Sequence, residues 1–496
     1  MSSELDRDSG YQWVALSVTT VGALLAALQG SSLVIALPDV LTSLGASFLT
    51  IMWVLLAYLL ITTALVPVIG RVVDMVGRKR LYVAGFAVFT FGSLLAGFSQ
   101  PQFHGWDLVA YRIVQGVGGA LLITNSTAIV ADAFRHGRVG FGLGVNQVAG
   151  AAGFLLGPVV GGLLTAISWR WVFLINVPLG IFGTIWGIWR LREPLMFPAH
   201  QRFDFAGSIT FVVGLGSLLM GLSLLAFPML PMPVVYALFV VALIALVGFL
   251  VVELRAPQPM LDLRLFENRL FAIAALASAL NGLARGAVLF VLIFFLQGPY
   301  GQDPLTAGLM MTPFGAAFLL VGPVSGYLSD RYGSRILSTA GLLVSGVGLY
   351  GLSTVVSTTP YWLIALYMAI MGGGSGLFNS PNVNALMSTV TPRQRGIASG
   401  VNTMLMNTGQ MLSISIAFPL VLSRIPEDVM FRVFLFGGGM GDMPDALHAF
   451  EDGLHQAFLV SVGITLVAAV ASALRPTHSP HAELQAQPVA ARSGGD

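Results

Sequence analysis

Two arginines stand inside long apolar segments of this chain, where a charged side chain needs a chemical reason. Arg112 is followed three residues later by Gln115, and Arg285 follows Asn281 by one helical turn. Residues three or four apart share one face of a helix. An arginine fork binds anionic groups and backbone carbonyls. Each pair therefore predicts either a substrate or proton pathway, or a hydrogen bond between packed helices.

Several amides also stand in apolar segments and share the ability to donate and accept hydrogen bonds. They are Gln29, Asn125, Asn146, Gln147, Asn379, Asn382, Asn384 and Asn407, the last on a polar face with Thr403 and Gln410. Amides of this kind join helices inside membranes with bonds worth about 0.6 kcal/mol each. We expect most of them to do so, and a minority to line a substrate cavity.

The segments that carry these residues have the composition of membrane spans. Of 496 residues, 56% are hydrophobic and 9% charged, against about 25% charged in soluble domains. Apolar blocks of about 20 residues recur, as the hydrocarbon thickness requires. We predict fourteen spans, at 13–37, 48–69, 81–99, 107–129, 140–165, 171–189, 205–226, 232–252, 270–297, 304–328, 336–357, 361–389, 396–422 and 454–474.

Basic residues in loops predict the orientation, because arginine and lysine accumulate on the cytoplasmic side. With the amino terminus inside, nineteen fall on cytoplasmic segments and three on the opposite side: Arg170, Arg424 and Arg432. The sequence therefore predicts a multi-pass protein of the cell (inner) membrane with both termini in the cytoplasm.

A displacement of 256 residues relates the two ends of the chain. Gly70, Asp74 and Gly77 recur as Gly326, Asp330 and Gly333, and two further segments repeat with the same displacement. Repeats of this kind are typical of secondary transporters, which alternate access to a site at the repeat interface. The predicted organisation is a cytoplasmic tail at 1–12, a six-helix half at 13–190, inserted spans 7 and 8 at 204–253, a second six-helix half at 270–474 and a disordered tail at 475–496.

Five segments carry a family resemblance. They are GRVVDMVGRKR from Gly70, GYLSDRYGSR from Gly326, RIVQGVGGA from Arg112, GFLLGPVVGG from Gly153 and WRWVFLINVPLG from Trp169. The chain resembles the major facilitator superfamily, and within it the fourteen-span drug:proton antiporter branch. That resemblance implies an all-α integral membrane fold, two six-helix halves plus two inserted helices, and proton-coupled multidrug efflux.

The first two segments predict a conformational latch at the cytoplasmic ends of the halves. Its expected residues are Gly70, Asp74, Gly77, Arg78 and Lys79, with Gly326, Asp330 and Arg335 in the second copy. A carboxylate near a helix N-terminus is favourable. The simpler alternative, positive-inside topology, explains the basic residues but not Asp74 or the glycines.

Glycines predict close packing of span 5. Gly150, Gly153, Gly157 and Gly161 recur at helical spacing and leave a thin stripe for a neighbouring helix, with Gly162 beside it. Pro158 adds a possible site for a kink. The resemblance associates this segment with exporters, although close packing alone would need the same stripe.

One departure from the resembling branch concerns its energy source. Its first span is similar to L-D-x-T-x-V-N-V-A-L-P, whereas this chain reads LQGSSLVIALP, with Gln29 at the acid and Val34 at the asparagine. No acidic residue lies deep in a predicted span, since Asp39, Asp107, Asp132 and Asp303 stand at span ends. A glutamine cannot carry a proton. The cavity is therefore expected to be positive and to suit neutral, anionic or zwitterionic amphiphiles.

The leading function hypothesis is export of a drug-like or lipid-like amphiphile. Alternatives are an exporter or facilitator of an anionic metabolite or lipid without carboxylate-based coupling, and a membrane sensor. The sequence has no nucleotide-binding loop, no metal-ligand spacing and no cysteine, so we expect no cofactor, no nucleotide and no enzyme activity. A net charge of +2 also disfavours nucleic acid. The expected partners are the bilayer and a small molecule, and the expected state is a monomer. The segment 423–455 is predicted to be an outside loop that lies at the interface or is unspecialised.

Overall fold

The computed structural model is all-helical in the part of the chain that it describes. The described residues are 2–134, 139–193, 204–226, 230–256, 259, 261, 263–390, 395–422, 429 and 443–476. Some side chains inside these helices, including those of Asp74 and Asp330, are not described. Most of the predicted tail at 475–496 and most of the predicted loop at 423–455 lie outside the described residues. The tail was predicted to begin at Arg475, but Arg475 is buried, and its guanidinium donates to Ser338 Oγ at 3.2 Å and to Asn382 Oδ1.

The first half of the chain contains six long helical segments. Its elements are α1 (Ser2–Leu44), α2 (Phe48–Val76), α3 (Arg78–Gly97), η1 (Pro101–Phe103), α4 (Trp106–Ala133), α5 (Val139–Ile167), α6 (Trp171–Leu174) and α7 (Asn176–Arg190). The next two helices form the inserted pair: α8 (Phe205–Ala226) and α9 (Met232–Arg255).

The second half repeats this order. Its elements are η2 (Leu263–Glu267), α10 (Arg269–Arg285), α11 (Val288–Gln297), α12 (Pro304–Met310), α13 (Thr312–Tyr332), α14 (Ser334–Leu352), α15 (Tyr361–Ser388), α16 (Arg395–Leu422) and α18 (Pro444–Ala473).

Twelve helical segments in the described part are long and apolar enough to cross a membrane. They coincide with twelve of the predicted spans. The remaining two predictions fall on α5 and α16, helices of 29 and 28 residues that include side chains outside the description. The fourteen-span count stays a prediction.

Several helices extend beyond the predicted spans. The expected tail at 1–12 is the start of α1, which meets no proline before Pro38 and continues to Leu44. Asp39 therefore lies inside this helix and not at its end. Likewise, α18 begins at Pro444, ten residues before the predicted span, because Pro444 is suited to the first helical turn and no further proline follows until Pro476.

The first two predicted spans of the second half are each interrupted. Span 9 divides into α10 and α11, where the Ala287 backbone N–H donates to Ser413 Oγ at 3.0 Å. Span 10 divides into α12 and α13, where Pro313 supplies no N–H to the helix. The composition of span 9 gave no sign of its break, whereas Pro313 in span 10 is a sequence signal that the predicted continuous span left out.

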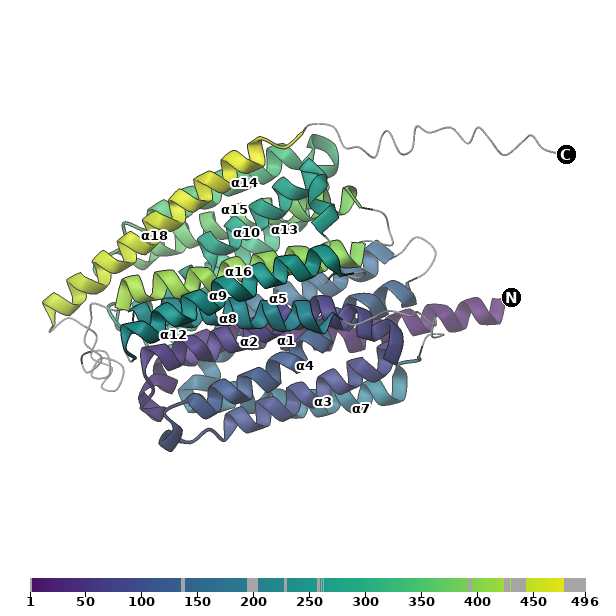
Figure 1. Ribbon diagram of the computed structural model, residues 1–496, viewed down its shortest axis with the longest axis horizontal. Helices are drawn as coiled ribbons and strands as arrows, with labels where there is room; N and C mark the ends of the chain where they lie inside the picture. Colours follow the sequence, from purple (N-terminus) through teal and green to yellow (C-terminus); the bar gives the residue numbers. More distant parts are fainter. Residues whose placement is uncertain are drawn as a thin grey trace.

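Helix packing follows the sequence repeat. In the first half α1 packs on α5, α3 on α4, α2 on α4 and α3 on α7. In the second half α10 packs on α16, α14 on α15, α13 on α15 and α14 on α18. Figure 1 shows α3, α4 and α7 on one side of the molecule and α14, α15 and α18 on the other. The 256-residue displacement thus corresponds to two bundles built alike.

Glycines hold one pair of helices together in each bundle. A Cβ atom on Gly118 of α4 would collide with the backbone of Phe89 on α3, and one on Gly374 of α15 with the backbone of Ser345 on α14. The two glycines are 256 residues apart, as are Gly85 and Gly341 at the same contacts. Close backbone approach through small residues is the usual way to pack helices in membranes.

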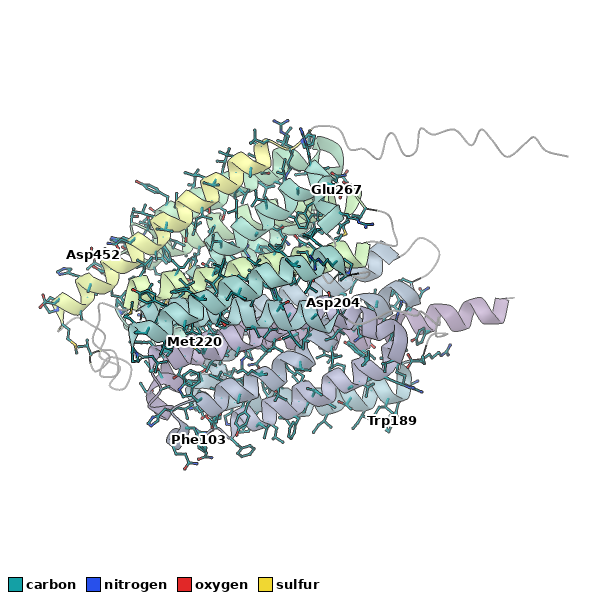
Figure 2. All side chains as sticks on the ribbon, in the orientation of Figure 1. Phe103, Trp189, Asp204, Met220, Glu267 and Asp452 are labelled. Atoms are coloured by element: carbon teal, nitrogen blue, oxygen red, sulfur yellow. The ribbon has the colours of Figure 1, made fainter. Side chains whose placement is uncertain are left out.

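The two bundles meet closely at the end of the molecule away from the start of α1. Gln297 Nε2 on α11 donates to the Ile35 carbonyl of α1 at 2.9 Å. At the same end, Gly162 of α5 lies against Leu305, and Gly308 of α12 against Pro158. Figures 1 and 2 show α1 beginning at one end, and the labelled Phe103 and Asp452 at the other. The inserted α8 contacts α2 and α16, one helix from each bundle.

Candidate substrate site

Arg112 lies in a hydrogen-bonded cluster inside the first bundle. Its Nε donates to the Val54 carbonyl of α2 at 3.0 Å, and Nη1 donates to Gln115 Oε1. Gln115 Nε2 in turn donates to Ser93 Oγ of α3 at 2.7 Å. The guanidinium also covers the ring of Tyr58, 4.2 Å from its centroid. With 1% of its surface exposed, Arg112 joins α2, α3 and α4.

Arg285 has a different environment. It is the last residue of α10, at the break before α11. Its guanidinium lies 5.8 Å and 5.9 Å from the ring centroids of Phe314 and Phe318 on α13. Among the described residues it has no hydrogen-bond or ion-pair partner, and the side chain is partly exposed. Asn281, one turn earlier, is buried.

Gln29 is paired with an amide that the sequence did not single out. Asn176 Nδ2 of α7 donates to Gln29 Oε1 and, at 3.2 Å, to the Val172 carbonyl. Both amides are fully buried, and neither Gln29 Nε2 nor Asn176 Oδ1 has a partner among the described atoms. The pair joins α1 to α7 where the resembling branch has an acid.

The other predicted amides divide between helix contacts and more open positions. Asn125 Nδ2 donates to Leu121 O of its own helix at 2.7 Å, and Asn146 Nδ2 to Ser126 Oγ at 2.8 Å, linking α5 to α4. Asn379 of α15 and Asn407 of α16 are partly exposed although they lie within long helices. The first two therefore have structural bonds, and the second two stay candidates for the cavity.

The repeat displacement exposes an asymmetry between the bundles. Tyr58 corresponds to Phe314, and Gln29 corresponds to Arg285, each pair being 256 residues apart. The counterparts of Arg112, Gln115 and Ser93 are apolar and fully buried: Met368, Met371 and Leu349. Each bundle thus has one arginine beside the same aromatic position, and of these two only Arg112 has hydrogen-bond partners among the described residues. The sequence could have revealed both correspondences through its own displacement.

The described contacts of the first copy of the predicted latch lie within the first bundle. Arg78 Nη1 donates to the Ala128 carbonyl of α4 at 3.1 Å, and the Lys79 backbone N–H donates to Glu193 Oε1 at 3.2 Å. Gly77, with φ of 109°, has Glu193 against its α-carbon. Arg335 is partly exposed in the first turn of α14. Gly326 lies near Ser380 on α15.

The remaining latch residues are described only as helical: Gly70 and Asp74 in α2 and Asp330 in α13. A latch between the bundles stays a prediction.

Three members of the predicted glycine stripe contact α1. An added Cβ on Gly153 would lie against Leu24, and one on Gly157 or Gly161 against Ser31 or Ser32. Gly150 differs, because open space surrounds it. Pro158 and Gly162 instead face α12 of the other bundle, and α5 continues through Pro158 without a break.

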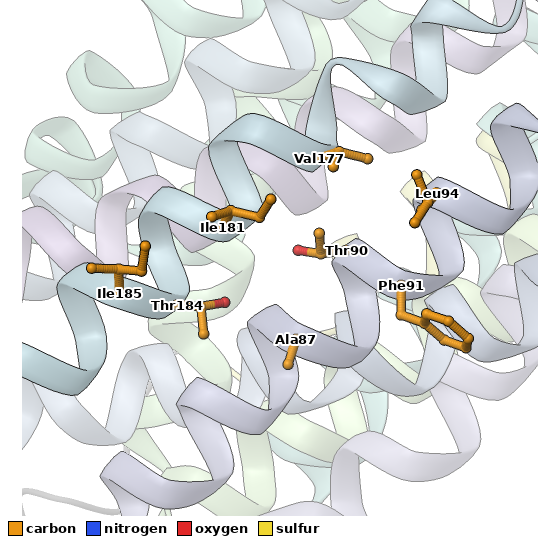
Figure 3. A pocket seen from close by; sticks show the side chains of 8 residues that line it. All are labelled: Ala87, Thr90, Phe91, Leu94, Val177, Ile181, Thr184 and Ile185. Carbon is orange, nitrogen blue, oxygen red and sulfur yellow. The ribbon is translucent and has the colours of Figure 1, made fainter.

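A pocket of about 320 Å³ lies elsewhere, on the outer side of the first bundle between α3 and α7. Figure 3 shows its lining, which includes Phe91, Leu94, Ile181 and Ile185. All four are well exposed, as side chains facing lipid are. The polar members, Thr90 and Thr184, bond to carbonyls of their own helices. This pocket offers no polar recognition and is separate from the candidate site.

Comparisons with known proteins agree with this architecture. The model of the Major Facilitator Superfamily matches residues 19–254 and 274–493. The riboflavin transporter RibZ of Clostridioides difficile (strain 630) is 31% identical over 386 residues, covering 78% of this chain and 83% of the relative. Multidrug resistance protein 3 of Bacillus subtilis (strain 168) is 29% identical over 422 residues, covering 84% and 80%.

A solved structure shares the fold at low identity. The bacterial homologue of the human lysosomal transporter Spinster, in an inward-facing and unoccupied conformation, aligns with a TM-score of 0.65 at 15% identity, covering 94% of this chain and 97% of that one. Since the family model matches most of the chain and the repeat-related bundles have the matching fold, this protein belongs to the major facilitator superfamily.

Proposed function

We propose that this protein exports an amphiphilic small molecule by alternating access between its two bundles. The observation that carries this proposal is Arg285, a partly exposed cation without a described hydrogen-bond or ion-pair partner at the break between α10 and α11. The two bundles meet closely at one end of the molecule. Broken helices at a repeat interface are where secondary transporters bind substrates. Relatives named as multidrug and riboflavin transporters support the amphiphilic class.

Proton coupling is the expectation from the family resemblance, but the α1 position favours a second candidate. Gln29 is hydrogen-bonded to Asn176, and an amide exchanges no proton. The nearest carboxylate on α1, Asp39, stands ten residues further on, about 15 Å along the helix. An exporter or facilitator of an anionic or zwitterionic compound without carboxylate-based coupling fits this arrangement. A membrane sensor has no observation in its favour.

Transport by purified protein in liposomes tests both candidates. Riboflavin, fluorescein and rhodamine 123 serve as fluorescent probes, with an imposed pH gradient and with the gradient collapsed by nigericin. Protein-dependent movement of any probe supports export, and sensitivity to nigericin supports proton coupling. Gln29→Glu, which restores the acid, is the matched variant: a gain of pH dependence would place coupling at α1. Failure of all three probes to move or exchange would contradict the proposed function.

A further inference from the structure

The surroundings of Arg285 define a chemical class of ligand. A buried arginine in a membrane protein is costly, about 2.5–3.5 kcal/mol even on mild insertion scales, and is normally repaid by hydrogen bonds. Arg112 makes such bonds, because its guanidinium donates to the Val54 carbonyl and to Gln115 Oε1. Arg285 has none among the described residues. Its donors therefore stay available for a partner that is not part of the chain.

The local backbone holds Arg285 in place. Gly282 and Gly286 lie so close to Met406 and Gln410 of α16 that a Cβ atom on either would collide with that backbone. The Ala287 N–H donates to Ser413 Oγ on the same helix. The break after α10 is consequently fixed against α16, and Arg285 points across to α13. A cation at a helix C-terminus is also favoured by the helix dipole.

Two rings form a platform beside the guanidinium. Phe314 and Phe318 are stacked with centroids 6.4 Å apart and an interplanar angle of 20°. Phe314 is 3% exposed, whereas Phe318 is partly exposed. Helix α13 packs on α15 of its own bundle and on α5 of the first bundle, and Phe318 keeps part of its surface exposed. A flat ring can stack there while an attached anion meets the arginine fork.

We propose that Arg285, Phe314 and Phe318 bind a flat aromatic molecule carrying an anionic group, with the anion on Arg285 and the ring against Phe318. This assignment rests on the proposed export function and names the substrate class of that same cavity. The counterpart of Arg285 in the first bundle is Gln29, and no carboxylate among the described residues forms an ion pair with Arg285. In this proposal the anionic group is therefore bound by Arg285 of the second bundle, without a cation at the counterpart position of the first.

Equilibrium binding to purified full-length protein in detergent tests the assignment. Fluorescein and rhodamine 123 share a flat ring system and differ in charge, so their fluorescence anisotropy separates ring stacking from charge recognition. We expect the wild type to bind fluorescein and Arg285→Gln to weaken that binding by about tenfold or more. Arg285→Lys should be intermediate, because one ammonium replaces a planar fork. Rhodamine 123 binding should not weaken in Arg285→Gln.

Two further variants complete the test. Arg255→Gln changes an exposed arginine at the end of α9 and should leave fluorescein binding unchanged. Phe318→Leu should weaken both dyes, by about threefold or more, because each loses a stacking face. Size-exclusion profiles matching the wild type verify that the variants are folded, and Arg285→Lys retains the charge if Arg285→Gln is unstable.

Two results would overturn the proposal. One is unchanged fluorescein binding in Arg285→Gln, and the other is a wild type that binds no fluorescein. Liposome transport tests the export function separately. If the wild type transports rhodamine 123 but does not bind fluorescein, the anion assignment is wrong and the proposed export function is still supported.

Discussion

In each bundle an arginine lies near the aromatic ring at the same repeat position, but the hydrogen bonding of the two arginines differs. In the first, Arg112 covers Tyr58 and bonds to a carbonyl and an amide. In the second, Arg285 lies near Phe314, the counterpart of Tyr58, without a described hydrogen bond. The two bundles have the same helix arrangement. At this repeat position the first bundle has a hydrogen-bonded arginine, and the second has an arginine without a described hydrogen bond. This difference is the basis for the structural role assigned to Arg112 and for the proposed binding role of Arg285.

The largest expected effect follows removal of Arg112. Arg112→Met should lower the free energy of unfolding by about 3 kcal/mol, because the Val54 carbonyl and the Gln115 amide lose their buried donor. Thermal unfolding in detergent, followed by tryptophan fluorescence, measures this loss. The triple variant Ser93→Leu, Arg112→Met and Gln115→Met copies the apolar counterparts Leu349, Met368 and Met371, and should regain most of the stability. A triple variant as unstable as the single one would contradict a purely structural role.

Glycine contacts should respond alike in both bundles. Gly118→Ala and Gly374→Ala each press a Cβ atom into a neighbouring backbone, and each should cost about 2 kcal/mol. Gly150→Ala, in open space on α5, should instead gain about 0.5 kcal/mol. The same unfolding assay ranks the three. A large cost at only one of the two repeat positions would mean that the bundles are not packed equivalently.

Helix starts give a pH-dependent difference between repeat counterparts. Asp303 caps α12, and Ser47, 256 residues earlier, caps α2 through the Thr50 N–H at 3.2 Å. Either change to alanine should cost about 1 kcal/mol at neutral pH. Hydrogen bonds from the side chain and backbone of Thr306, and from the Leu305 N–H, hold the pKa of Asp303 below its ordinary value.

The sign of the pH effect follows from that lowered pKa. The carboxylate's stabilising contribution is present above the unfolded value of about 4 and is lost as pH falls through the folded-state pKa. The cost of Asp303→Ala should therefore shrink in acid, while that of Ser47→Ala stays constant. Unfolding measured between neutral and acid pH checks this, and parallel pH profiles would refute it.

Arg285 should have the smallest effect on stability. Arg285→Met is expected to cost less than about 0.5 kcal/mol of the free energy of unfolding, because no described hydrogen bond is lost and an uncompensated cation is removed from the span. Its unfolding curve compared with that of Arg112→Met gives a direct contrast. A loss as large as that of Arg112→Met would show that Arg285 has structural partners.

Much of the fold was predictable because a bilayer imposes simple rules. Span length, helix type and the pairing of the halves follow from apolar runs and from one displacement. The helix break at Ala287 was not predictable from its own segment, because it depends on Ser413 of a distant helix. The break at Met311 was not predicted either, although Pro313 follows it. The early starts of α1 and α18 were not predicted, because each helix begins with polar residues that precede its apolar run.

The candidate site was predictable in part. Arg112, Gln115, Gln29 and Arg285 were identified as polar residues in apolar spans, but their partners were not. Asn176 and Ser93 contact them only through tertiary packing. Whether an arginine in a span is bonded depends on neighbours that are far away in sequence.

The most direct measurement compares fluorescein transport into liposomes by the wild type, Arg285→Gln and the triple variant at Ser93, Arg112 and Gln115. If Arg285 binds the substrate and Arg112 supports the fold, the triple variant keeps transport near the wild-type rate. Arg285→Gln then loses transport by about tenfold or more. Full transport by Arg285→Gln together with none by a folded triple variant would contradict this division of roles.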